Sequence, residues 1–181
     1  MGDHLRPDLD QFLIELDDPD PLVRQEAAIR LGDFCREDHP AIDVLIERLQ
    51  SPDNAFHDRA CAAWALGRIK AKAGEVIPTL LTLLEEMKEH PEADELRSYA
   101  AEAVERLTDD IEILTTVVRH CLHDRYFKCR MHGLFLVERL FKKRSKLRDG
   151  FVPMIIPLAK DEVEEIRANA RRILIGFQED E

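Results

Sequence analysis

Apolar residues recur three and four positions apart along most of the chain, the spacing of one face of an α-helix. Ile111, Leu114, Val117, Val118 and Leu122 form one such series. Five amphipathic segments of this kind predict one helix each, here called helix A. They span Leu9–Leu16, Ile42–Leu49, Val76–Met87, Ile111–Leu122 and Val152–Ala159.

A second kind of segment follows each helix A and repeats along the chain. Its first copy runs from Asp18 to Gly32, with a basic residue, an alanine pair and a Leu-Gly at fixed offsets. Later copies keep only part of this pattern, and each copy predicts a second helix, here called helix B. The basic residue that sets the register is Arg24, Arg59, Arg97, Lys128 and Arg167 in the five copies.

Two helices in each period of about 36 residues predict a helical-hairpin repeat. Pro, Asp, Asn and Ser occupy the turns, where they end one helix and cap the next. A single hairpin cannot bury its apolar face, whereas five stacked hairpins share one core. The sequence therefore predicts an all-α, right-handed α-solenoid that forms one domain over residues 1–181. The predicted repeats span about 8–35, 41–70, 75–108, 110–141 and 150–178.

The repeated pattern D-x-D-P-x-V-R-x-x-A-A-x-x-L-G, preceded by L-I-x-x-L-x-D/S-P, resembles a HEAT repeat. It is most similar to the HEAT-like subtype of bacterial phycobilin-lyase-type proteins. The first two repeats match well, the third and fifth moderately and the fourth poorly. The resemblance implies the solenoid fold and leaves the function open, since this architecture carries many roles.

The five basic residues that set the register of the helices B have two possible roles. They could form a structural ladder, a row of ion pairs between neighbouring repeats, or a stripe that contacts a ligand. The resemblance implies that each pairs with an acid in the turn of a neighbouring repeat, for which Asp20, Asp53, Asp94 and Asp161 are available. The ridge of helix B opposite the buried stripe is expected to line a concave surface. Trp, Tyr and Arg dominate the hot spots of protein interfaces. The binding candidates on this ridge are Trp64, Arg68, Tyr99, Arg106, Tyr126, Arg130 and Arg172. Packing between neighbouring helices is the alternative role for Trp64.

The net charge of −11 argues against binding of nucleic acid or anionic membranes by the whole surface. Residues 119–148 nevertheless carry 10 Lys or Arg and only two acids. The run from 142 to 148 is too densely charged to be buried. It is either a solvated loop or a docking site for an acidic partner or polyanion, through Lys142, Lys143, Arg144, Lys146 and Arg148.

Sequence motifs for catalysis are absent. No Gly-rich phosphate loop or G-x-S-x-G motif is present. His120 and His123 lie three residues apart, but a metal site needs three or four converging ligands. No histidine is followed by Glu, unlike the iron-binding His-Glu pairs of a HEAT-type hydroxylase. We therefore expect no catalytic residue, metal or cofactor.

The location and function follow from these patterns as expectations. The longest uncharged apolar run, from Phe151 to Ala159, cannot span a bilayer, and no secretory signal is evident. Four cysteines without zinc or redox spacing are expected to be free thiols in the cytoplasm. The leading hypothesis is a non-enzymatic protein-binding scaffold. The alternatives are a phycobilin-lyase-like chaperone or enzyme, and polyanion binding through residues 119–148.

Overall fold

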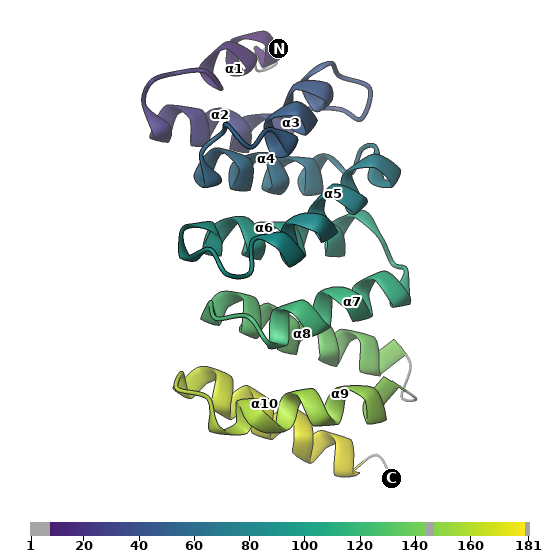
Figure 1. Ribbon diagram of the computed structural model, residues 1–181. Coiled ribbons are helices and arrows are strands. Elements are labelled where there is room, and N and C mark those ends of the chain that lie inside the picture. The colour runs from purple at the N-terminus through teal and green to yellow at the C-terminus, as the bar shows by residue number, and fades with distance from the viewer. Residues whose placement is uncertain (1–7, 144–146, 180–181) are drawn as a thin grey trace, which may run out of the picture.

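Every regular element that the structure describes is helical (Figure 1). The computed structural model describes residues 8–143 and 147–179. The helices A are α1 (Leu9–Glu15), α3 (Ala41–Gln50), α5 (Ala73–Glu86), α7 (Ile111–Leu122) and α9 (Arg148–Ile155). The helices B are α2 (Pro21–Phe34), α4 (Phe56–Ile69), α6 (Asp94–Leu107), α8 (Phe127–Lys143) and α10 (Glu164–Glu179). The 3-10 turns η1 (Pro91–Ala93) and η3 (Ile156–Lys160) precede α6 and α10.

The helices pair into five hairpins that stack in one direction, with the two ends of the chain at opposite ends of the stack (Figure 1). Each helix B packs against the helix B of the next hairpin, so that α2, α4, α6, α8 and α10 form a continuous row. One cluster of buried apolar side chains runs from Leu16 to Phe177. This arrangement is an α-solenoid and confirms the predicted fold class. No helix of the described part is long and apolar enough to cross a membrane.

Acidic residues begin several of these helices as predicted for N-caps. The Asp20 carboxylate accepts a hydrogen bond from the backbone N–H of Leu22 at 2.9 Å, and Pro21 takes the first helical position of α2. Asp110 caps α7 in the same way, through the N–H groups of Glu112 and Ile113. Because these side chains satisfy donors that the helix leaves open, they fix where α2 and α7 start.

Small residues let the first three helices B approach closely. A Cβ atom added at Gly67 of α4 would lie 2.7 Å from the Cα of Ala103 in α6. One added at Gly32 of α2 would lie 2.8 Å from the ring of Trp64 in α4. No side chain larger than hydrogen fits these two positions without a shift of the neighbouring helix. The Leu-Gly of the repeat pattern is therefore a packing feature.

Candidate functional site

An arginine in each helix B reaches into the turn of its own hairpin, and Arg59, Arg97 and Arg130 are buried there. Arg97, with a fully buried side chain, is the most extensively bonded. Its Nη1 donates to the carbonyls of Met87 and His90, both at 2.8 Å. Its Nε and Nη2 donate to Asp124 of the next hairpin, at 2.7 and 3.0 Å. Asp94 accepts a further bond at 2.6 Å, and the two carboxylates raise the pKa of Arg97 against the effect of burial.

The same arrangement recurs in the other hairpins with different acids. Arg24 donates to Asp58 at 2.9 Å, and Arg130 pairs with both oxygens of Asp161 at 2.8 and 2.9 Å. Arg59 has no such carboxylate; its Nε donates to the carbonyl of Leu49 at 3.0 Å, and burial lowers its pKa. The basic residues thus form the structural ladder that the resemblance implied, rather than a ligand-binding stripe. Of the expected acids, Asp94 and Asp161 take part, whereas Asp20 caps its helix.

The register of the fourth helix B differs from the expected one by two residues. Arg130 is buried and occupies the ladder position, whereas Lys128 is exposed. Gly133 and Val137, which a register set by Lys128 would place on the ridge, are buried. The ridge in α8 therefore consists of Lys128, His132, Phe135 and Arg139, and Tyr126 lies in the turn before the helix. Of the proposed binding residues, Arg130 is engaged in the ladder and Tyr126 does not lie on the ridge.

We use the name B-helix ridge for the corrected set of residues along the helices B. The ridge in the first two hairpins includes Leu22, Glu26, Ile29, Asp33, His57, Cys61, Trp64 and Arg68. The last three hairpins contribute Glu95, Tyr99, Glu102, Arg106, Lys128, His132, Phe135, Arg139, Glu165, Asn169, Arg172 and Gly176. Phe135 is 54% exposed, and the register expected from the sequence did not place it on the ridge. It is the aromatic side chain that this ridge leaves most open.

Charged side chains of the ridge are paired with one another. Arg68 donates to Asp33 of the first hairpin at 2.6 Å, and its guanidinium lies 5.4 Å from the centre of the Trp64 ring. Arg172 pairs with Glu138 of the fourth hairpin, and Arg106 pairs with Glu102 in its own helix. These ion pairs fix the arginines in place and connect neighbouring helices B. The arginines of this ridge therefore stabilise the arrangement of the repeats in the absence of a partner.

The two tyrosines have different surroundings. Tyr99 is half-buried on the ridge, where burial raises the pKa of its hydroxyl. Tyr126 packs edge-on against Phe127, with ring centres 5.5 Å apart, and the Lys128 ammonium lies 5.7 Å from its ring centre. Trp64, Tyr99 and Phe135 thus give the three central hairpins one aromatic side chain each on the B-helix ridge.

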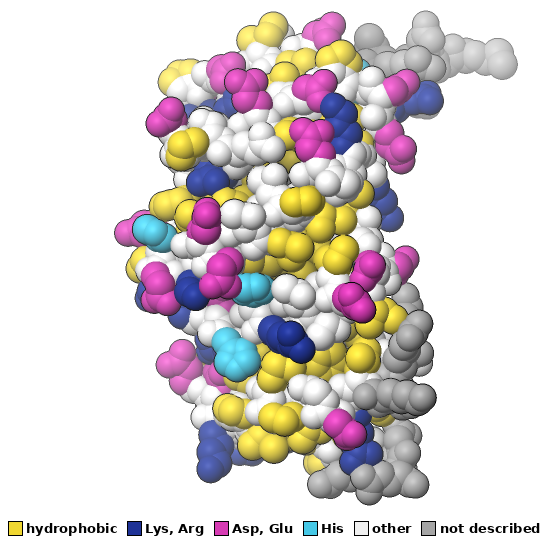
Figure 2. Space-filling view, turned by 45° about the vertical axis from the view of Figure 1, so that its right-hand side comes forward, with side chains coloured by type: hydrophobic (Ala, Val, Ile, Leu, Met, Phe, Trp, Pro, Cys, Tyr) yellow, Lys and Arg dark blue, Asp and Glu magenta, His cyan; other side chains and the backbone are white. Residues whose placement is uncertain are grey.

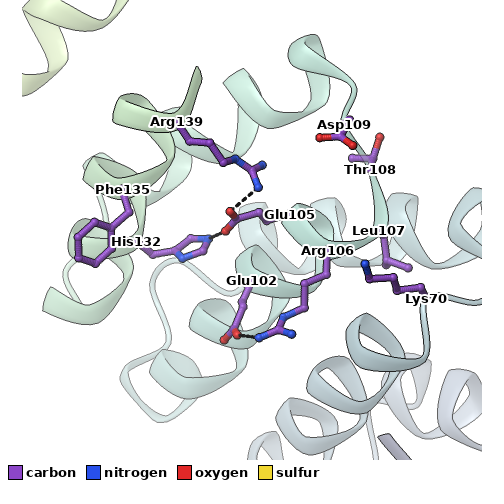
Figure 3. Close-up of a pocket in the computed structure, with 10 residues that line it drawn as sticks. All are labelled: Lys70, Glu102, Glu105, Arg106, Leu107, Thr108, Asp109, His132, Phe135 and Arg139. Carbon is purple, nitrogen blue, oxygen red and sulfur yellow. Dashed lines mark hydrogen bonds and ion pairs between the residues drawn. The ribbon is translucent and has the colours of Figure 1, made fainter. Parts of the chain in front are cut away.

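A cavity of about 580 Å³ opens beside the ridge, between the second, third and fourth hairpins (Figure 3). Glu105 lies at its centre, with one carboxylate oxygen 2.7 Å from Nη1 of Arg139 and the other 3.1 Å from Nε2 of His132 (Figure 3). Burial lowers the pKa of His132, although Glu105 opposes this effect. The lining residues are Lys70, Glu102, Glu105, Arg106, Leu107, Thr108, Asp109, His132, Phe135 and Arg139.

The described basic residues between 119 and 148 do not form one patch on the folded chain. Arg119 and Arg125 lie at one end of the fourth hairpin, and Lys142 lies at the other end of the 17-residue helix α8. On the face shown in Figure 2, Lys and Arg side chains are scattered among acidic ones. Lys142 is exposed and Arg148 is half-buried with an interaction partner. Arg144 and Lys146 lie outside the described residues, as does the side chain of Lys143.

The thiols of the described residues are poorly suited to nucleophilic chemistry. Burial raises the pKa of Cys61 to about 12, and it also raises the pKa values of Cys35, Cys121 and Cys129 above the ordinary value of a thiol. A thiol with so high a pKa carries almost no thiolate at neutral pH. Within the described ranges, no group of three His, Cys, Asp or Glu side chains is placed to hold a metal ion.

The comparison with known families agrees with this geometry. A family model of HEAT repeats matches residues 9–127. The chain belongs to the HEAT-repeat family. HEAT repeats commonly serve as protein-interaction scaffolds, and the match does not extend to the phycobilin-lyase subtype, which is not confirmed. No curated protein matches the chain at a significant level.

The HEAT match ends where the fourth helix B begins, but the geometry continues. Arg130 and Arg167 of the last two hairpins donate to turn carbonyls in the manner of Arg97. The fourth and fifth hairpins are therefore HEAT-like in structure, although the fourth matches the repeat pattern poorly in sequence and the fifth only moderately.

Proposed function

We propose that this HEAT-repeat protein is a non-enzymatic scaffold that binds a protein partner along the B-helix ridge. The observation that carries the proposal is the series Trp64, Tyr99 and Phe135, one aromatic side chain in each central hairpin. Neighbouring packed helices lie about 8–10 Å apart, so a partner crossing the ridge meets a new aromatic contact at that interval. Aromatic side chains of this kind dominate the energy of protein interfaces.

The pairing of the ridge charges supports the same reading. Since Arg68, Arg106 and Arg172 already pair with acids of the helices B, they cost little further desolvation when a partner covers them. Phe135 remains largely exposed, and its burial by a partner is favourable. The ridge thus combines a rigid, charge-neutralised border with apolar contacts, the usual anatomy of a protein interface.

The cytoplasm is the location that we propose for this scaffold. Cys35, Cys61, Cys121 and Cys129 are free thiols in the structure. Free thiols persist in a reducing compartment, whereas secreted proteins oxidise them to disulfides. Polyanion binding through Lys142 and its neighbours, and a bilin-handling role, are not favoured by a specific feature of the described residues.

Photo-crosslinking tests the proposed surface directly. Benzoylphenylalanine is placed at Phe135 on the ridge and, as a control, at Ile156, an equally exposed apolar residue of η3 (54% in both cases). We expect a discrete crosslinked protein from position 135 in cells and none from position 156. Crosslinking at position 156 alone, or none from either position 135 or Tyr99, would contradict the proposal.

A substitution complements the crosslink. Phe135→Ala removes an exposed ring and should leave the thermal unfolding midpoint within about 2 °C of the parent. Once crosslinking has identified the partner, the purified pair should bind at least about fivefold more weakly with this variant. Unchanged affinity would place the partner elsewhere on the molecule.

A further inference from the structure

Neighbouring hairpins stack through the same position of helix B, eight residues after the ladder arginine. In the first two hairpins this position is Gly32 and Gly67, where an added Cβ would lie 2.8 and 2.7 Å from the next helix B. In the third and fourth it is Glu105 and Glu138, which pair with side chains of α8 and α10. Four successive interfaces therefore depend on this position.

The same position of the last hairpin is Ile175, which no helix of the described chain covers. Ile175 is 56% exposed. The position four residues after the ladder arginine changes in the same way. In the earlier helices B it is buried, as Ala28, Ala63, Ala101 and Leu134. In α10 it is the exposed Arg171. The lower end of the stack in Figure 1 therefore presents the stacking face of a helix B, with an apolar and a cationic side chain on it.

A hollow of about 620 Å³ extends from Ile175 to α8, and most of its lining is apolar. Its charged side chains are three cations and one carboxylate, namely Lys142, Arg171, Arg172 and Glu138. The carboxylate is already paired with Arg172. This end of an acidic chain is therefore locally cationic and suits an acidic surface with apolar side chains.

The first hairpin, at the opposite end of the stack, has a surface of that kind (Figure 1). Six residues after the ladder arginine, Ala65 and Ala103 receive the preceding hairpin. In α2 this position is the exposed Arg30, and Phe34 follows one turn later on the same face with 48% of its surface exposed. Residues 8–35 carry eight Asp or Glu and only two Arg. The two ends are thus complementary in charge, and both expose apolar side chains.

We infer that the end of α10 binds the first hairpin of a second copy of this chain, head to tail. The contact continues the packing of one helix B on the next, with Ile175 against α2 and Arg171 near the acids of the first hairpin. A contact between unlike ends does not close on two copies, so it builds a row in which the B-helix ridges join. At physiological salt, charges more than about 8 Å apart are screened, so the charges at the contact outweigh the repulsion between two acidic chains. This inference goes beyond the proposed function, since it concerns the ends of the solenoid.

Sedimentation velocity of the purified chain in about 0.15 M salt tests the contact. We expect the average mass to rise steadily from about 10 µM to about 1 mM, without a plateau at the dimer. Ile175→Glu places a carboxylate opposite the acidic hairpin, and Phe34→Glu removes the exposed ring from the other end. Each should weaken the association by about tenfold or more.

Phe127→Glu is the matched control. It makes the same change at an exposed aromatic residue of α8, which already has a helix B on either side. We expect this variant to associate within about twofold of the parent. Circular dichroism should show thermal midpoints close to that of the parent for all three variants, since each alters a partly exposed side chain.

A mixture of the two end variants gives the most specific result. Phe34→Glu retains an intact α10 end and Ile175→Glu an intact first hairpin, so an equimolar mixture should form a discrete dimer that grows no further. A photo-crosslink provides a second test without a change of charge. Benzoylphenylalanine at position 175 should crosslink two copies, and the crosslinked peptide should map to residues 21–34 of the second copy.

A chain that stays monomeric up to about 1 mM would overturn the inference and leave the α10 end to a different protein. Association of either end variant alone would also overturn it, because identical ends would then meet. So would a mixture that remains monomeric, an equal loss in Phe127→Glu, or a crosslink that maps outside the first hairpin.

Discussion

The α4–α6 and α6–α8 interfaces differ at one equivalent position of helix B. Eight residues after the ladder arginine, α4 has Gly67 and α6 has Glu105. Gly67 admits the backbone of Ala103 so closely that no Cβ fits between them. Glu105 instead bridges to His132 and Arg139 of α8. The first contact joins the two helices through small apolar groups, and the second joins them through charged side chains.

The ladder shows the same contrast. Among the described residues, Arg59 forms no ion pair with the third hairpin and is acted on only at longer range by Glu86, whereas Arg97 pairs with Asp124 of the fourth. Close packing leaves no volume for a ligand, whereas long charged side chains at the α6–α8 interface border a cavity. The candidate binding site therefore lies at the α6–α8 interface, here called the charged interface. The α4–α6 interface, here called the glycine interface, acts as a rigid support for it.

The largest expected effect is at the buried ion pair of the charged interface. Arg97→Met removes the ion-pair partner of Asp124, whose side chain is only 7% exposed, and removes one hydrogen bond each from Asp94 and from the carbonyls of Met87 and His90. Breaking a buried pair on one side costs about 3–5 kcal/mol. Urea unfolding, monitored by circular dichroism at constant pH, should show a loss of this size in the free energy of unfolding.

Arg59→Met is the matched substitution at the glycine interface. Since Arg59 has one hydrogen bond and, among the described residues, only the more distant carboxylate of Glu86 acting on its charge, the lost bond and the relieved burial of a charge nearly offset each other. The expected change is within about 1 kcal/mol of zero. Similar losses for both variants would show that the two interfaces do not differ as the ladder indicates.

A smaller effect is expected from crowding the glycine interface. Gly67→Ala introduces a Cβ next to the backbone of Ala103, and the helices must separate to accept it. Overpacking outweighs the helix-propensity gain of alanine, and the net loss should be about 1–2 kcal/mol. Gly176→Ala in α10 meets nothing within 4 Å and should stabilise by up to about 1 kcal/mol. The comparison is contradicted if both variants gain stability.

The hairpins and the ladder were predictable because they depend on local pattern. Helix faces, capping acids and the alanine pair repeat at fixed offsets, so the first two repeats fixed the register of Arg24, Arg59 and Arg97. The fourth repeat offered two basic residues, Lys128 and Arg130, at similar offsets. What decides between them is the ion pair with Asp161, a residue 31 positions away. Spacing within one segment contains no information about that contact.

The candidate site was less predictable for the same reason. Trp64 and Tyr99 were identified from residue type and register, but Phe135, His132 and Arg139 were missed because the wrong register placed them off the ridge. The cavity depends on where Glu105 directs its carboxylate and on the left-handed backbone of Lys70. Both are properties of the packed structure, although the Gly-to-Glu change at one repeat position was visible in the sequence.

The smallest expected effect is a dependence of stability on pH, which should arise at the charged interface and not at the glycine interface. Burial lowers the pKa of His132 in the folded chain, despite the opposing influence of Glu105 and Glu102, and Arg139 lowers it further. The unfolded chain takes up this proton near the ordinary value of about 6.5. Below that pH the unfolded state binds more protons than the folded state, so stability decreases as the pH falls.

His132→Gln should remove this part of the pH dependence. The free energy of unfolding is measured at about pH 7.5 and about pH 5.5 for the parent and the variant, and the parent should lose more between the two values. The same measurement on Gly67→Ala should show the parent's pH dependence, since that substitution alters the interface that lies on the other side of α6. Equal losses in the parent and His132→Gln would mean that protonation of His132 does not weaken the charged interface.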